Sequence, residues 1–571
     1  MYAPDRPLVV QSDMTILLEA DSPQYEKARD HLIRFADLEK SPEHIHTYRI
    51  TPISLWNAAA SGVTANEIIE VLESLSRYPV PQSVRHEIVE HISRYGRVKM
   101  YAGDKALRLV SDDEAVIAQI LRHPAVTPFL AGLADSRTVL VRPEYRGRVK
   151  QELTRMGLPV EDLAGYVEGD QLEINLRDVT SAGAPFRLRP YQEAAVASFY
   201  AGGSERGGSG VIVLPCGAGK TIIGLGTMSI LKTETLILST NVVAVRQWID
   251  EILDKTTLEP GLVGEYTGEK KEVRPVTVTT YQVLTHRGSE QDYPHFSLFS
   301  RKNWGLIIYD EVHLLPAPVF RITAELQARR RLGLTATLVR EDGREHEVFS
   351  LIGPKRFDLP WKELEREGWI ATATCHEIRV EMDPERRLEY ATADEKNKYR
   401  IASENPGKVA IVMELLKMHR SDQVLVIGQY LDQLHQIAEL TGAPLITGKV
   451  SNAQRRRLYD QFKRGELGIL VVSKVANFAI DLPDANVAIQ VSGTFGSRQE
   501  EAQRLGRILR PKKNGSQAQL YSLVTRDTKD QEFAANRQLF LTEQGYRYTI
   551  WDEASFMSEV RGRIEKGFGG V

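Results

Sequence analysis

Three short segments carry residue types that together could hydrolyse a nucleotide. They are Pro215-Cys216-Gly217-Ala218-Gly219-Lys220-Thr221, Asp310-Glu311-Val312-His313 and Gln503-Arg504-Leu505-Gly506-Arg507-Ile508-Leu509-Arg510. The first segment can cradle phosphates, the second can hold a magnesium ion and polarise a water, and the third can bring arginines to a developing negative charge. The last two segments are far enough apart in the sequence for a further domain to lie between them. This layout predicts two lobes that close over one ATP.

The first segment has the surroundings that a phosphate-binding loop needs. It follows an apolar run that ends at Leu214, and a helix is expected from about Ile222. Glycines let backbone N–H groups face phosphate oxygens, Lys220 can reach the β- and γ-phosphates, and the Thr221 hydroxyl can bind Mg²⁺. Gln192 lies upstream, and its amide can pair with an adenine edge. The full set of predicted nucleotide-binding residues is Arg189, Gln192, Pro215, Cys216, Gly217, Ala218, Gly219, Lys220, Thr221 and Gln503.

The acidic pair and the arginines complete the predicted chemistry. Asp310 suits a magnesium-bound water, and Glu311 suits the orientation and deprotonation of the attacking water. Arg504, Arg507 and Arg510 recur every three residues, which places them along one side of a helix. We predict that Arg507 and Arg510 reach the γ-phosphate from the second lobe when the lobes close. The hydroxyls of Thr335 and Thr337 could relay the nucleotide state.

The elements that must position these residues are short buried strands. Apolar runs without alternation are typical of parallel strands covered by helices on both faces. The runs are Val211–Leu214, Leu236–Leu238, Val276–Val278, Leu306–Tyr309, Val424–Ile427, Ile469–Val472, Val487–Val491 and Leu520–Val524. We therefore predict two doubly wound α/β lobes. Residues 380–408 are polar and could form either a helical protrusion or a linker.

The residues before the first lobe show no catalytic constellation. Strands are expected at Leu8–Val10 and Thr15–Glu19, and a helix over Ala65–Tyr78. A compact α/β module is predicted for residues 130–180. Its expected parts are a strand at Thr138–Val141, a helix at Tyr145–Met156 and an alternating strand at Gln171–Leu176.

Composition indicates a globular intracellular protein without a membrane anchor. The 571 residues are 42% hydrophobic and 26% charged, and no apolar run approaches the roughly 18 residues of a membrane span. Two cysteines, Cys216 and Cys375, are too few for a four-thiolate zinc or iron–sulfur site. The net charge of −3 does not favour nucleic-acid binding by the chain as a whole. Local contacts to nucleic-acid phosphates are predicted for Thr280, at a strand end, and for Arg246.

The motifs in this order resemble those of superfamily-two helicases, and the stretch from Arg187 to about Val524 resembles the XPB family of repair helicases. The distinguishing segments are Leu332-Gly333-Leu334-Thr335-Ala336-Thr337-Leu338-Val339-Arg340-Glu341-Asp342, Ile352-Gly353-Pro354-Lys355, Asp481-Leu482-Pro483 and Gly496–Arg507. A weaker resemblance to the XPB N-terminal domain covers Tyr48–Lys99. The chain departs from the family pattern at Val475-Ala476-Asn477-Phe478.

The resemblance implies RecA-like lobes, ATP and Mg²⁺ as cofactors, and 3′-to-5′ opening of DNA duplexes, forks or bubbles in nucleotide excision repair. It also implies that Arg340, Glu341 and Asp342 help to separate strands. A repair nuclease is a candidate partner, and a bacterial or archaeal cytoplasm, at the nucleoid, is the expected location. Two other activities stay open: an RNA-dependent ATPase, and an ATP-switched clamp that melts DNA for partner nucleases.

The resemblance also suggests a division of the chain. The expected domains are an XPB-like N-terminal domain over residues 1–125, a damage-recognition-like α/β module over 126–182, an ATP-binding lobe over 183–375, a thumb-like or linker segment over 376–408 and a second lobe over 409–571.

Overall fold

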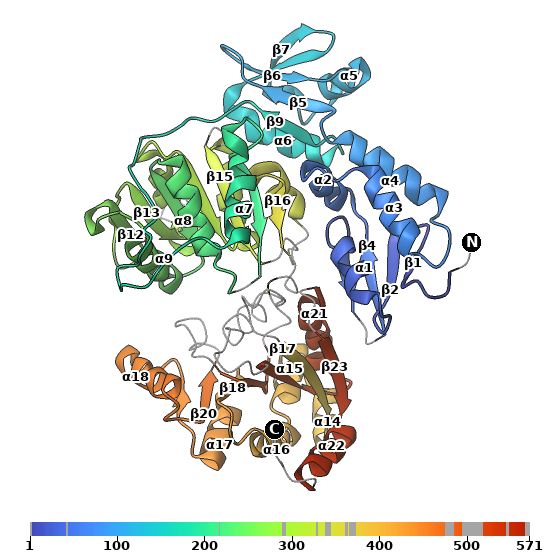
Figure 1. Ribbon diagram of the computed structural model, residues 1–571, viewed down its shortest axis with the longest axis vertical. Helices are drawn as coiled ribbons and strands as arrows, with labels where there is room; N and C mark the ends of the chain where they lie inside the picture. Colours follow the sequence, from blue (N-terminus) through green and yellow to red (C-terminus); the bar gives the residue numbers. More distant parts are fainter. Residues whose placement is uncertain are drawn as a thin grey trace.

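The protein folds into four units, each built on one β-sheet (Figure 1). The computed structural model describes residues 3–41, 44–215, 217–287, 293–326, 329–336, 344–359, 364, 373–473, 485–493, 518–543 and 547–565. No helix in this described part of the chain combines the length and the apolar character needed to cross a bilayer.

The first unit pairs a small antiparallel sheet with four helices. The sheet order is β1-β2-β4-β3, and the elements are β1 Leu8–Val10, β2 Thr15–Glu19, α1 Tyr25–Leu32, β3 Asp37–Lys40, β4 Ile45–Arg49, α2 Pro52–Ala60, α3 Ala65–Leu75 and α4 Gln82–Arg94. Helix α3 begins where the Thr64 hydroxyl accepts the Glu67 N–H and the Glu67 carboxylate accepts the Thr64 N–H. The predicted strands β1 and β2 and the helix α3 are confirmed.

The second unit is a five-stranded mixed sheet with two helices. The sheet order is β7-β8-β6-β5-β9, and the elements are β5 Val98–Tyr101, β6 Leu107–Val110, α5 Glu114–Arg122, β7 Leu130–Asp135, β8 Thr138–Val141, α6 Arg146–Arg155 and β9 Val160–Leu163. The predicted strand β8 and the helix α6 are confirmed. Strands β5 and β6 precede residue 125, so this sheet extends across the expected boundary at 125/126.

The predicted strand at Gln171–Leu176 is wrong. The segment is extended, but it makes only isolated bridges, from Gln171 to Thr233 and from Leu176 to Thr256. Its apolar residues instead enter the core of the first lobe, where Ile174 is fully buried. The alternation thus reflects one apolar face packed against the core of the first lobe, and within the described residues the segment joins no sheet.

The first lobe is a seven-stranded parallel sheet flanked by helices. The strand order is β12-β13-β11-β14-β15-β10-β16, with β10 Ser209–Val213, β11 Thr235–Ser239, β12 Val263–Tyr266, β13 Val276–Thr280, β14 Leu306–Asp310, β15 Arg330–Thr335 and β16 Lys355–Asp358. The helices are α7 Pro190–Tyr200, α8 Lys220–Leu231, α9 Val242–Lys255, α10 Tyr281–Leu284, α11 Ala317–Glu325, α12 Glu345–Glu347 and the π-turn η7 Val348–Ile352. The doubly wound lobe predicted from the apolar runs is confirmed.

The second lobe is another seven-stranded parallel sheet. Its order is β19-β20-β18-β21-β22-β17-β23, with β17 Ala373–Val380, β18 Val424–Gly428, β19 Leu445–Ile446, β20 Ile469–Ser473, β21 Val487–Gln490, β22 Ala518–Thr525 and β23 Arg547–Asp552. The helices are α14 Pro384–Thr392, α15 Glu395–Ser403, α16 Gly407–Met418, α17 Leu431–Thr441, α18 Asn452–Lys463, α21 Lys529–Glu543 and α22 Glu553–Glu565. Strand β17 crosses the expected boundary at 375/376.

Residues 380–408, for which a protrusion and a linker were both open, form the helices α14 and α15. Helix α15 packs into the second lobe rather than away from it. Its Tyr399 is 2% exposed, and the Tyr399 hydroxyl donates to the Gly493 carbonyl. Helix α15 is therefore a packed part of the second lobe, whereas no residue of α14 is buried.

The first unit touches both lobes (Figure 1). On the first lobe, the Asn57 side chain accepts the Lys355 N–H at 2.9 Å, and the Ser61 hydroxyl donates to the Lys355 carbonyl at 2.8 Å. On the second lobe, the Gln538 amide on α21 donates to the Ser41 carbonyl at 2.8 Å. The first unit therefore connects the two lobes through contacts outside the chain between them.

Candidate active site

The predicted phosphate loop connects β10 to α8 at the carboxyl end of the first sheet, where open parallel sheets bind ligands. Gly217 and Gly219 have φ angles of 83° and 76°, which L-residues with side chains rarely adopt. A Cβ on Gly219 would lie 2.6 Å from the Gln192 amide nitrogen. The two glycines are thus required by the path of the loop, and α8 begins directly after them at Lys220.

The acidic pair lies at the end of β14 and meets the phosphate loop. The Lys220 ammonium is 2.9 Å from Glu311 Oε1, and the two side chains are 11% and 13% exposed. Residues that are 91 positions apart in the sequence are therefore in contact, as the predicted site requires. In this arrangement Glu311 balances the charge that Lys220 would otherwise offer to a phosphate.

The Asp310 carboxylate is held by two donors on one oxygen. The Ser239 hydroxyl donates to Oδ2 at 3.1 Å, and the Trp248 indole N–H donates to the same oxygen at 3.0 Å. Burial and then repulsion from Glu311 raise the pKa of Asp310 above its usual range. Burial is the largest single influence on Glu311 and opposes its ionisation, but Lys220, His313 and the Ala336 N–H together outweigh burial and lower the pKa of Glu311. The pair thus differs in proton affinity, and Glu311 is the better candidate for a carboxylate base.

Glu311 is one of the few non-glycine residues with a left-handed backbone, at φ 50°. Its carboxylate also accepts the Ala336 N–H. Two residues on, the His313 ring nitrogen Nδ1 lies 2.6 Å from the Thr335 hydroxyl at the end of β15. The acidic segment is therefore tied to the threonine segment within one lobe.

Magnesium suits the donors present. Mg²⁺ in nucleotide sites is held by one or two carboxylates together with substrate phosphates and waters, so a dense protein cage is not needed. Thr221 offers a hydroxyl in the first turn of α8, and Asp310 offers a carboxylate at the end of β14, next to the Glu311 that contacts Lys220. In the described residues no group of three or more His, Cys, Asp or Glu forms a separate metal cage. The donor set therefore fits a magnesium ion that arrives with the nucleotide.

Gln192 and Arg189 lie beside the phosphate loop, with their polar groups engaged. The Gln192 side chain is 3% exposed, donates to the Ala218 carbonyl at 3.2 Å and accepts the Arg189 N–H at 2.9 Å. The Arg189 guanidinium donates to the Tyr191 hydroxyl at 3.1 Å. Pairing of Gln192 with adenine would require its amide to give up these two bonds.

The two residues of this lobe predicted to contact DNA differ in exposure. Thr280 is 1% exposed, and its hydroxyl accepts the Val283 N–H at the start of α10. Arg246 is half-exposed on α9, and its guanidinium is 2.5 Å from Glu269. Arg246 is thus accessible to a phosphate, whereas the Thr280 side chain is covered.

Several predicted residues lie outside the described residues. They are Cys216, Thr337, Arg340, Glu341, Asp342, Gln503, Arg504, Arg507 and Arg510. Their assignment to nucleotide binding, strand separation and the arginine fingers stays a prediction from the sequence.

Four residues at the site were not assigned from the sequence: Ser239, Trp248, Tyr281 and His313. The Tyr281 hydroxyl donates to the Asp310 carbonyl at 2.8 Å. Ser239 ends β11 and Tyr281 follows β13, so their position at strand ends was a usable signal. Trp248 lies in the middle of a helix, and nothing in its neighbourhood in the sequence marks it.

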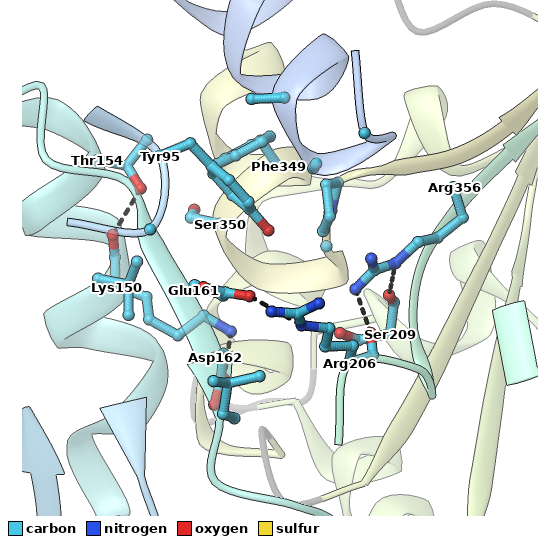
Figure 2. A pocket seen from close by; sticks show the side chains of 18 residues that line it. Tyr95, Lys150, Thr154, Glu161, Asp162, Arg206, Ser209, Phe349, Ser350 and Arg356 are labelled. Atoms are coloured by element: carbon cyan, nitrogen blue, oxygen red, sulfur yellow. Dashed lines mark hydrogen bonds and ion pairs between the residues drawn. The ribbon is translucent and has the colours of Figure 1, made fainter. Parts of the chain in front are cut away.

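A separate cavity of about 280 Å³ lies where the first unit, the second unit and the first lobe meet (Figure 2). Inside it the Arg206 guanidinium is 3.3 Å from Glu161, and the Lys150 ammonium is 2.9 Å from Asp162. None of the residues predicted for catalysis, nucleotide binding or DNA contact lines it. The cavity is a junction between domains and not the nucleotide site.

Comparison with protein families matches three parts of the chain. Residues 364–565 match the ERCC3/RAD25/XPB C-terminal helicase, residues 185–340 the type III restriction enzyme res subunit, and residues 8–134 a helicase conserved C-terminal domain. Among solved structures, the ATP-dependent type ISP restriction-modification enzyme LlaBIII bound to DNA matches with a TM-score of 0.50 and 12% identity. That match covers 80% of this chain and 42% of that chain, and it shows the fold alone.

Two relatives extend the match to nearly the whole chain. The DNA 3′-5′ helicase XPB of Mycobacterium tuberculosis is 54% identical over 549 residues, which cover 96% of this chain and 98% of that protein. The general transcription and DNA repair factor IIH helicase/translocase subunit XPB of Encephalitozoon cuniculi is 34% identical, over 95% of this chain and 82% of that protein. With identity at this level across both lobes and both N-terminal units, the chain belongs to the XPB family of DNA 3′-5′ helicases.

Proposed function

We propose that the protein is an ATP- and Mg²⁺-dependent DNA 3′-5′ helicase or translocase that opens duplexes, forks or bubbles in nucleotide excision repair. The observation that carries the proposal is the contact between Lys220 of the phosphate loop and Glu311 of the acidic pair. Membership of the XPB family supports DNA as the substrate. The proposal includes a repair nuclease as partner and a place in the cytoplasm at the nucleoid.

The residues of the first lobe divide the work of hydrolysis in this proposal. Lys220 leaves Glu311 for the phosphates when ATP binds, and this frees the Glu311 carboxylate to orient the attacking water. Thr221 and Asp310 would hold Mg²⁺, which would supply positive charge to offset the negative charge of the phosphates. Arg507 and Arg510 arrive from the second lobe, so that closure of the lobes and hydrolysis are linked.

Substitution of the two contacting residues tests the site. We expect Lys220→Ala and Glu311→Gln each to lower the ATPase rate about 10²- to 10³-fold, because each removes a principal electrostatic group. Glu311→Gln should still bind ATP, whereas Lys220→Ala should bind it poorly. The matched control is Lys232→Ala at the other end of α8, where the half-exposed lysine pairs with Glu173. Wild-type turnover in either site variant would contradict the assignment.

An unwinding assay separates the proposed activity from the two others left open. The measurement is strand separation on duplexes with a 3′ tail, a 5′ tail or no tail, with ATPase rates on DNA and RNA at one salt concentration. A helicase of this polarity should open the 3′-tailed duplex and be stimulated by DNA. Nuclease-dependent melting with little unwinding would favour the clamp, and equal stimulation by RNA would favour the RNA-dependent ATPase.

A further inference from the structure

Trp248 joins three elements of the nucleotide site. It lies on the buried face of α9 with Val245 and Ile252 and is 2% exposed. Its ring lies against Gly224 of α8, where a Cβ would come within 2.5 Å of the ring atom Cη2. Its indole N–H donates to Asp310 at the end of β14. One side chain thus touches both the helix of the phosphate loop and the acidic pair.

The hydrogen bonds of Asp310 are asymmetric. Trp248 and Ser239 both donate to Oδ2, at 3.0 and 3.1 Å. Among the described residues no donor is bonded to Oδ1. A carboxylate with one oxygen held by two fixed donors cannot rotate without losing both bonds, and bonds to a charged acceptor are stronger than those between neutral groups. Its other oxygen therefore keeps a fixed direction.

We propose that Trp248 is a positioning residue for the metal: it fixes the Asp310 carboxylate through Oδ2 and so presents Oδ1 to the Mg²⁺ of the nucleotide. The inference rests on the proposed function, which assigns Asp310 to magnesium. It goes further, because it attributes the orientation of the Asp310 carboxylate to the indole of Trp248 on α9. Tight control of the ligands around a metal is a general requirement for affinity, and removal of an outer hydrogen bond commonly lowers it 10- to 100-fold.

A purely structural role for Trp248 can be separated from this one, because the lobe holds a matched tryptophan. Trp304 is 1% exposed, and its indole N–H donates to the Leu298 carbonyl at 3.0 Å. The substitutions Trp248→Phe and Trp304→Phe each remove one buried indole donor from the core of the same lobe. Only the first removes a bond to Asp310.

The experiment measures Mn²⁺ binding, as the probe for the metal, to the full chain with ADP by electron paramagnetic resonance. ADP affinity without metal and the unfolding temperature are measured in parallel. We expect Trp248→Phe to weaken Mn²⁺ binding about tenfold and to leave metal-free ADP affinity unchanged. Trp304→Phe should lower the unfolding temperature to a similar extent with wild-type Mn²⁺ affinity. Unchanged Mn²⁺ affinity in Trp248→Phe, or equal loss in both variants, overturns the inference.

Two further variants keep the test decisive. If Trp248→Phe does not fold, Gly224→Ala displaces the ring, and its control Gly226→Ala meets only Val196 and Leu188, at 3.0 and 3.3 Å. Loss of Mn²⁺ affinity in Gly224→Ala alone supports the inference, and equal affinity in the two overturns it.

Asp310→Asn tests the underlying assignment: wild-type Mn²⁺ binding in this variant contradicts the proposed function itself. Loss in Asp310→Asn without loss in Trp248→Phe overturns only the role of Trp248.

Discussion

Two of the active-site residues with a left-handed backbone, Gly219 and Glu311, adopt it for different reasons. Gly219 takes φ 76° where the phosphate loop turns into α8, and an added Cβ would lie 2.6 Å from the Gln192 amide nitrogen. Glu311 takes φ 50° although it has a side chain, an arrangement that costs about 1–3 kcal/mol and is typical of functional sites. Its contacts with Lys220 and with the Ala336 N–H offset that strain.

At the residue scale, Gly219→Ala should weaken nucleotide binding at least tenfold. The new methyl would lie 2.6 Å from the Gln192 amide nitrogen, so that this amide would have to leave the Ala218 carbonyl of the phosphate loop. Gly442→Ala is the control, because Gly442 ends α17 at φ 68° with no atom within 4 Å of an added Cβ. It should cost about 1 kcal/mol of stability from backbone strain alone and leave binding unchanged. Nucleotide titration with thermal unfolding of both variants checks this, and equal affinities would show that sterics at Gly219 do not matter.

At the scale of elements, a fully buried ion pair joins α16 and α21 beneath the end of β21. The Lys408 ammonium is 2.6 Å from Asp530 and donates to the Val491 carbonyl at 3.0 Å. Both side chains are 0% exposed, and burial lowers the pKa of Lys408. Gly493, two residues beyond Val491, is the last described residue before the segment that holds the predicted arginine fingers. The pair thus anchors the backbone from which that segment starts.

Lys408→Met should destabilise the second lobe by about 3–5 kcal/mol, because it leaves the Asp530 carboxylate buried without its partner. The double variant Lys408→Met with Asp530→Asn should recover part of that loss. Lys417→Met is the control on the same helix, since Lys417 is half-exposed beside Glu414 and such pairs contribute little. Urea unfolding of the full chain measures all three. A loss no larger than that of Lys417→Met would rule out the anchoring role.

The elements also show what the sequence could and could not predict. Strands β10, β11, β13 and β14 follow from their apolar runs, because strands buried on both faces do not alternate. Strand β17 was missed, since it carries the buried Glu377, whose carboxylate accepts hydrogen bonds from Arg379 on the same strand and from Tyr548, 171 residues away. In the same way Lys220, Thr221 and the acidic pair follow from local motifs. Trp248 was missed because its bond to Asp310 joins residues 62 positions apart.

At the scale of the whole molecule, the contacts of the first unit limit how the lobes move. The unit contacts the first lobe through Lys355 and the second through Gln538. Movement of one lobe against the other must either break one of these contacts or carry the first unit along. The hydrogen bonding to the second lobe is the weaker of the two, because it is one bond from the Gln538 side-chain amide to one main-chain oxygen, whereas the main chain of Lys355 in the first lobe makes two.

Gln538→Ala should therefore loosen the first unit from the second lobe. Loss of one buried hydrogen bond of about 1 kcal/mol should raise hydrogen exchange in β3 roughly fivefold and leave β1 unchanged. Gln531→Ala on the same helix is the control, since the Gln531 side chain bonds locally to the Asp527 N–H. Mass-spectrometric exchange on the full chain gives the result. Unchanged exchange in β3 would mean that the Ser41 contact does not hold the unit.

The place of β17 in its sheet has a consequence for synthesis of the chain. Its neighbours are β22 and β23, and both leave the ribosome long after β17 does. At about 5–20 residues per second, the wait is roughly 10–30 s. During that time the first three units can complete their sheets, while β17 presents two unpaired edges to any other nascent strand. Correct folding of the second lobe therefore depends more than that of the other units on translation speed and on chaperones that shield strand edges.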